Sequence, residues 1–254
     1  MTTFFLLPKY LFIMPSLIKE FFPELVLIPE GTFLMGSEDG LDNEKPVHRV
    51  CVDGFMIGKF PVTNSQYKIF LEETGFPETP FLSDEMFSHP DKPVVGTSWH
   101  DAIAYCDWLS KRSGEKLRLP TEAERERAAR GQSEGKKYPW GDEPPWERPF
   151  CGYDLETGGP QRVGLNEPNS FGLYDMSEGV HEWCSDFYDP SYYHHSPERN
   201  PQGPPSGQRR ASRGGSWRHR VKFSRCAARS SLIPSFRYAD YGFRVVMTVR
   251  SSPD

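Results

Sequence analysis

Cysteine is scarce in this sequence, and the cysteines present do not pair in a recognisable pattern. There are five, an odd number, and no two of them form a Cys-x-x-Cys motif. A scaffold stabilised by disulfides and a zinc site built from thiolates are therefore not expected. The same usage is typical of a reducing compartment, so we expect a cytoplasmic protein by default, with surface display as the alternative.

Long hydrophobic runs are also missing. The apolar start of the chain is interrupted by Pro8, Lys9 and Pro15, so no run reaches the roughly 18 residues that a membrane-spanning helix needs. The start also lacks the basic residues and the small-residue cleavage site of a signal peptide. We expect residues 1–24 to form an N-terminal extension packed on one domain over residues 25–254, with a membrane or partner anchor as the alternative.

Neither charge sign is in strong excess, since 30 Lys and Arg stand against 35 Asp and Glu. This balance gives no basis for a nucleic-acid partner, and none is expected. What the chain does have is 24 prolines and 22 glycines without any short repeat. That composition argues against a helical bundle or a doubly wound sheet and favours a mixed, loop-rich domain.

Three stretches nevertheless predict helices. Each begins with Ser or Thr, which is followed three residues later by Gln, Asp or Glu, and each ends at a glycine. The three stretches are residues 63–75, 98–114 and 121–131. Short strands are expected elsewhere, at residues 26–36 (two strands around a Glu-Gly turn), 50–57, 212–217 and 242–249. Between residues 138 and 193 no period dominates, which indicates ordered but irregular loops.

From Leu27 onward the chain carries short segments that occur together in one family. They include Leu-Pro-Thr-Glu-Ala-Glu at 119–124 and Asn-Ser-Phe-Gly-Leu-Tyr-Asp-Met at 169–176, and the others are residues 28–37, 43–48, 61–64, 93–99, 138–141, 213–217, 225–229 and 242–244. By this series the chain resembles the formylglycine-generating enzyme, or sulfatase-modifying factor, family. The resemblance implies an α+β fold of the C-type-lectin-like kind, loop-rich and low in regular secondary structure.

The family's enzymes are oxidases that convert a sulfatase cysteine to formylglycine with copper held by two cysteine thiolates. One of these cysteines follows Gly-Gly-Ser by three residues, and here that position is His219. The next cysteine, Cys226, matches one outside the copper pair. Soft thiolates are what Cu(I) requires, so no copper is expected. A family enzyme acting on a cysteine or small thiol is therefore the alternative function, not the first.

The resemblance also implies two features away from the copper site. Cys106 and Cys226 match halves of disulfides in secreted relatives, but the partner positions carry Val245 and Ala129, so buried free thiols are expected. Family members bind Ca²⁺ through a stretch that matches residues 175–182 here. A structural calcium ion is thus one expectation, with ligands at Asp175, Glu178, Val180 and Glu182. The alternative is that Asp175 and Glu182 pair with core arginines such as Arg229 or Arg244.

The C-terminal region is similar to the variable proteins of diversity-generating retroelements, which display ligand-binding residues on this fold. Such proteins carry Gly-Gly-Ser-Trp, then Cys-Ala-x-Arg, then Gly-Phe-Arg, and all three motifs occur here within residues 214–244. Adenine-directed mutagenesis of AAC codons cannot produce Lys, Gln, Glu, Met or Trp. Across residues 218–224 and 230–241, Lys222 is the only residue of an excluded type.

These observations predict a ligand-binding protein without catalysis, whose variable region spans about residues 212–246. Aromatic and cationic side chains on a turn-rich stretch resemble a paratope, which favours an unknown protein or other macromolecule as the ligand. The fixed frame is expected at Trp217, Cys226, Arg229 and residues 242–244. The predicted ligand-binding residues are Arg218, His219, Arg220, Lys222, Phe223, Leu232, Phe236, Tyr238, Ala239 and Asp240.

Overall fold

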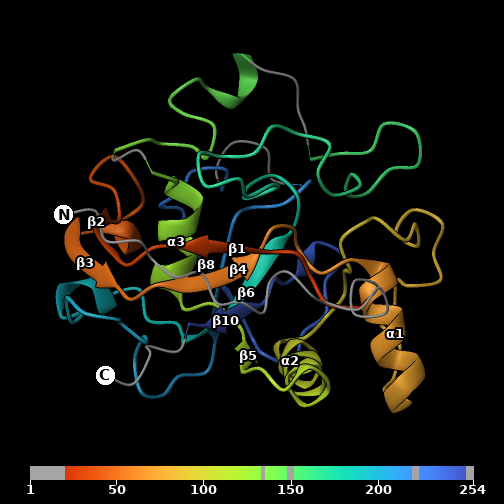
Figure 1. The fold of residues 1–254 in the computed structure, drawn as a ribbon. Helices are drawn as coiled ribbons and strands as arrows, with labels where there is room; N and C mark the ends of the chain where they lie inside the picture. The colour runs from red at the N-terminus through yellow and green to blue at the C-terminus, as the bar shows by residue number, and fades with distance from the viewer. Residues whose placement is uncertain (1–20, 133–134, 148–151, 219–222, 250–254) are drawn as a thin grey trace, which may run out of the picture.

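Long loops connect short helices and strands in the computed structural model, which describes residues 21–132, 135–147, 152–218 and 223–249 (Figure 1). The loops of residues 152–180 lie together in the upper part of Figure 1, whereas the first two helices lie at the lower right. The fold is α+β, as predicted. None of the helices in the described ranges is long and apolar enough to cross a membrane.

The three helices form where the sequence predicts them and for the predicted reason. Each begins with a capping box, in which the Ser or Thr side chain accepts the backbone N–H three residues on and the side chain there returns a hydrogen bond. Gly75 and Gly114 end the first two helices in the left-handed conformation. The helices are α1 (Asn64–Thr74), α2 (Trp99–Ser113) and α3 (Glu122–Arg130).

One antiparallel sheet joins distant parts of the chain. Its strand order is β1-β4-β10-β5, so the central strand β4 lies between the first strand and the last. Beside it, β2 and β3 form a separate hairpin. The strand predicted at 50–57 is in fact two strands, because the chain leaves the strand conformation at Asp53 and Gly54. The bounds are β1 (Leu25–Ile28), β2 (Gly31–Met35), β3 (His48–Val52), β4 (Phe55–Gly58), β5 (Leu117–Arg118) and β10 (Val246–Thr248).

The second sheet positions the C-terminal loops. Its order is β8-β7-β6-β9, with β9 parallel to β6. The strand predicted at 212–217 begins earlier and stops where Gly214 and Gly215 take positive φ. The one predicted at 242–249 divides into β9 and β10. The bounds are β6 (His181–Phe187), β7 (Arg210–Arg213), β8 (Ser230–Leu232) and β9 (Tyr241–Gly242), and the 3₁₀ turns are Asp42–Glu44, Pro145–Glu147 and Tyr192–His194.

The core consists of an aromatic part and a part rich in buried charge. Tyr67, Tyr105 and Phe243 pack together between α1, α2 and the end of β9. Near α3, four arginines are fully buried, and acidic partners surround them: Arg125, Arg213, Arg229 and Arg244. Phe21 is buried against the aromatic part. Residues 1–20, the greater part of the predicted extension, lie outside the described ranges.

Candidate functional site

Two C-terminal loops are held together by hydrogen bonds immediately after β7 and before β9. Ser216 Oγ donates to Asp240 Oδ2 at 3.0 Å, and the Trp217 indole N–H donates to the Ala239 carbonyl at 3.3 Å. Backbone bonds tie both loops to the start of β6, from Trp217 N to Gly179 O and from His181 N to Asp240 O, each 2.8 Å. The two loops therefore form one surface with a shared support.

The second of these loops, residues 233–239, has a fixed backbone. Its carbonyls at Pro234 and Tyr238 accept the N–H groups of Trp99 and Gly96, at 2.9 and 3.1 Å. Arg237 donates to the buried carboxylate of Asp101 at 2.8 Å. That carboxylate also caps α2. The loop is thereby anchored to the start of a helix along most of its length.

Large side chains on this anchored loop point outward. Ile233 is 36% exposed, Phe236 42% and Tyr238 45%, and the last two rings lie 6.1 Å apart, edge to face. On the neighbouring loop the Arg218 side chain is 50% exposed. We call these four residues the display face. Their backbone is fixed by bonds that do not involve the displayed side chains of Ile233, Phe236 and Tyr238.

The structure places the predicted binding residues in four groups. Arg218, Phe236 and Tyr238 are exposed, and Phe223 and Ala239 are partly buried. The inclusion of Leu232 and Asp240 needs correction, because both are buried: Leu232 belongs to the core on β8, and Asp240 accepts the Ser216 hydroxyl. The remaining predicted residues lie outside the described ranges: His219, Arg220 and Lys222.

Sequence reasoning left Ile233 out of the predicted set. An aliphatic residue next to another one, in a stretch without strand or helix period, gives no signal for exposure. Its neighbour Pro234 is the residue whose carbonyl is anchored at α2, and that tertiary contact turns Ile233 outward.

A buried network of charges joins α3 to the end of β7 and to the stretch before β8. The Arg213 guanidinium bonds Glu122 Oε1 at 3.1 Å, also reaches Glu126, and donates to the Cys226 carbonyl at 2.9 Å. Arg229 bonds the two oxygens of Glu122 at 2.8 and 2.9 Å. Burial raises the pKa of the Glu122 and Glu126 carboxyls, but the arginines outweigh it and the net pKa is lowered. Both carboxyls are therefore ionised partners.

The two carboxylates expected to hold calcium, Glu182 and Asp175, have other partners. The Glu182 carboxylate is fully buried, and Arg125 and Arg244 each donate to both of its oxygens. Asp175 accepts from Gly164 N at 2.8 Å and from the Asn166 amide at 3.2 Å. Across the described ranges, His, Cys, Asp and Glu form no group of three or more able to hold a metal. The alternative pairing with core arginines is the arrangement that Glu182 adopts.

The residues near the expected copper position do not offer a thiolate either. The chain has no cysteine between residues 214 and 225, and His219 lies outside the described ranges. Burial raises the pKa of the Cys226 thiol to about 12, which keeps its sulfur protonated at neutral pH. Cys106 and Cys226 are both buried and free, as expected.

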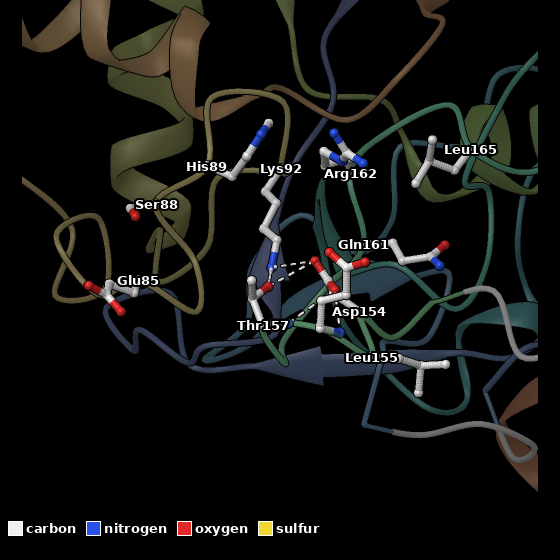
Figure 2. A pocket seen from close by; sticks show the side chains of 11 residues that line it. Glu85, Ser88, His89, Lys92, Asp154, Leu155, Thr157, Gln161, Arg162 and Leu165 are labelled. Atoms are coloured by element: carbon white, nitrogen blue, oxygen red, sulfur yellow. Dashed lines mark hydrogen bonds and ion pairs between the residues drawn. The ribbon is translucent and has the colours of Figure 1, made fainter.

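An open cleft of about 590 Å³ lies between residues 85–92 and residues 154–165 (Figure 2). On its inner wall the buried Lys92 ammonium bonds Thr157 Oγ1 at 2.7 Å, Asp154 at 3.1 Å and two carbonyls. Next to the cleft, Phe87 and Tyr153 pack on Trp217 at ring distances of 6.2 and 5.9 Å. Sequence neighbours of the cleft residues Ser88 and Asp154 therefore contact the loop that carries Arg218.

The sequence profile of one family, the sulfatase-modifying factor enzyme 1-like domain, matches residues 14–249. The chain belongs to this family. It is 34% identical over 245 residues to the serine/threonine-protein kinase pkn1 of Chlamydia pneumoniae, covering 89% of this chain but only 38% of the kinase. It is 32% identical over 286 residues to the formylglycine-generating enzyme of Bos taurus, covering 87% of this chain and 74% of the enzyme. The chain thus spans less than half the length of the kinase.

Solved structures show the same fold. PvdO from Pseudomonas aeruginosa superimposes with a TM-score of 0.76 at 29% identity, covering 89% of this chain and 95% of PvdO. Variable protein 1 of Treponema denticola superimposes with a TM-score of 0.78 at 24% identity, again covering 89% and 95%. The family therefore includes enzymes, and its fold is shared with a variable protein.

Proposed function

We propose that this protein binds a macromolecular ligand, a protein in the first instance, through the display face and without catalysis. The observation that carries the proposal is that the backbone of residues 233–239 is anchored while three of its large side chains are exposed. The backbone is bonded to α2 and to residue 96, while Ile233, Phe236 and Tyr238 stay exposed. Rigid aromatic side chains give large contact area at low cost in conformational entropy, and they dominate the energetics of many interfaces.

The display face is, in this proposal, a diversified one of the retroelement type. Two features support it: the residue types at 218–224 and 230–241, and the likeness in fold to a protein named as variable. The gene should then lie beside a reverse transcriptase gene and a near-copy of its own 3′ coding end that differs at adenines. Sequencing the neighbourhood tests this, and the absence of both elements would refute diversification while leaving binding open.

The binding role is tested with a display library. Positions 233, 236 and 238 are randomised together and the library is selected against lysozyme, a protein unrelated to any natural ligand. We expect folded binders of micromolar affinity or better, because the anchoring bonds are independent of the side chains varied. A matched library at the buried positions Leu232, Ser216 and Asp240 is expected to yield few folded members. If no folded variant from the first library binds, the face is not a general binding surface.

The competing family activity has its own test, because the chain is related to formylglycine-generating enzymes. The protein is incubated with Cu(I), oxygen and a peptide that carries a sulfatase cysteine motif. Mass spectrometry then reports whether the cysteine becomes formylglycine. We expect no conversion, since the sequence lacks the thiol pair. Stoichiometric copper binding together with turnover would refute the non-catalytic proposal.

A further inference from the structure

Glu182 lies at the centre of a fully satisfied set of hydrogen bonds. Its Oε2 accepts from the Nε atoms of Arg125 and Arg244, at 2.7 and 2.8 Å, and its Oε1 accepts from their Nη2 atoms, at 3.0 and 2.9 Å. An ionised carboxylate has about four lone-pair positions, so no position is left for another ligand. All three side chains are buried to within 1% of full burial.

The same two guanidinium groups also bind backbone oxygens of the loop that leads into β6. Arg125 Nη2 donates to Met176 O at 2.9 Å, and Arg244 Nη2 donates to Tyr174 O at the same distance. Arg244 Nη1 further donates to Gly58 O at 2.8 Å. A carboxylate and several carbonyls thus converge on two cationic groups from different parts of the chain. Convergent oxygens of this kind are what a calcium ion organises in proteins.

The charges match as well as the geometry. Two guanidinium groups carry the same formal charge as one Ca²⁺, and arginine keeps its proton at any pH at which a protein is folded. The positive charge at this point is therefore part of the chain and does not depend on the concentration of an ion.

We propose that the guanidinium pair of Arg125 and Arg244 takes the place of the calcium ion that the family resemblance implies at Glu182. The pair links β6 to the loop of residues 174–176 and makes the domain independent of calcium. Because Gly179 and His181, which lie in the chain between that loop and Glu182, bond both loops of the candidate site, the pair also holds the display face in position. The proposal stands whether or not that face binds a ligand.

The first test uses the unmodified protein. Thermal unfolding is followed in buffer with excess EDTA and in buffer with millimolar CaCl₂. A ligand that binds only the folded state raises the midpoint as its concentration rises. We expect the same midpoint in both buffers. A calcium-dependent rise of several degrees would overturn the proposal.

The second test removes the cations. In Arg125→Met, Arg244→Met and the double variant, the Glu182 carboxylate and the freed carbonyls form an oxygen-lined space. We expect lower midpoints in all three and a partial recovery in CaCl₂ that is largest for the double variant and absent in MgCl₂, because Ca²⁺ accepts irregular oxygen cages and Mg²⁺ does not.

The matched control is Arg213→Met, which removes a buried arginine bound to Glu122 and Glu126 instead. It should lose stability without recovering in calcium. If the double variant does not fold, Arg125→Met gives the answer, since it frees one position on each Glu182 oxygen. The proposal that the arginine pair replaces calcium would be refuted by either of two results. One is stability that does not respond to calcium in any folded variant, and the other is a response equal to that of Arg213→Met.

Discussion

Replacing Arg213 with Met should destabilise the protein strongly while leaving the display face chemically unchanged. Arg213 is buried, and its guanidinium bonds Glu122, Glu126 and the Cys226 carbonyl. Methionine fills much of the same space but leaves two buried carboxylates with fewer partners. Arg229 and Arg130 remain beside them, so their charge is only partly compensated.

The expected size follows from this burial. Removing one partner of a buried ion pair typically costs about 3–5 kcal/mol. For a domain of this size, each kcal/mol lowers the thermal midpoint by roughly 2–4 °C, so we expect a fall of about 10 °C. Urea unfolding should show a lower midpoint concentration. The slope of the unfolding free energy against urea concentration should not change, because the surface exposed on unfolding stays the same.

Arg218→Met is the matched control. It removes the same kind of side chain from the neighbouring loop, but Arg218 is half exposed and its distance to the Asp240 carboxylate is 4.0 Å. Exposed pairs contribute about 0–1 kcal/mol, so the midpoint should barely move. Equal losses for the two variants would refute the reasoning, because the buried network would then contribute no more than a surface charge.

Three further predictions concern single groups. Burial, together with the nearby Glu122 charge, raises the pKa of Asp186 from its ordinary value to about 7, so the folded state holds a proton that the unfolded state has lost. Stability should therefore fall as pH rises from about 4 to 7, and Asp186→Asn should reduce that fall in unfolding curves measured at several pH values. Thr121→Ala removes the side-chain cap of α3 and should cost about 1 kcal/mol in urea unfolding. Lys92→Met should speed amide hydrogen exchange in residues 85–92 and 154–158, because the ammonium that joins these loops is lost; unchanged exchange would contradict the contact.

Local rules predicted the helices well. The three capping boxes and their terminal glycines are complete within a few residues of sequence, so no distant contact is needed to locate α1, α2 and α3. β6 was not predicted, although it is the longest strand in the part of the chain that the structure describes. Its sequence, His-Glu-Trp-Cys-Ser-Asp-Phe, mixes buried charge with apolar residues, and only tertiary partners for Glu182 and Asp186 make that burial favourable.

The candidate site, like the fold, could be predicted only in part. The position of the face could be predicted, because the motifs that bound it recur in a family. The exposure of single residues could not, because Leu232 and Ile233 are chemically alike and adjacent. Strand pairing to β7 buries the first, and the bond between Pro234 and α2 exposes the second. Such distinctions depend on contacts that no local pattern contains.

The central claim is that a fixed frame carries side chains that can be exchanged. It is tested most directly by making every substitution at Phe236 and Tyr238, and at the buried Ser216 and Asp240, and measuring resistance to protease for each variant. We expect nearly all substitutions at Phe236 and Tyr238 to keep the resistance of the parent protein, and most at Ser216 and Asp240 to lose it. Equal sensitivity at the two pairs of positions would contradict the claim. The exposed aromatic side chains would then be needed for the stability of the fold.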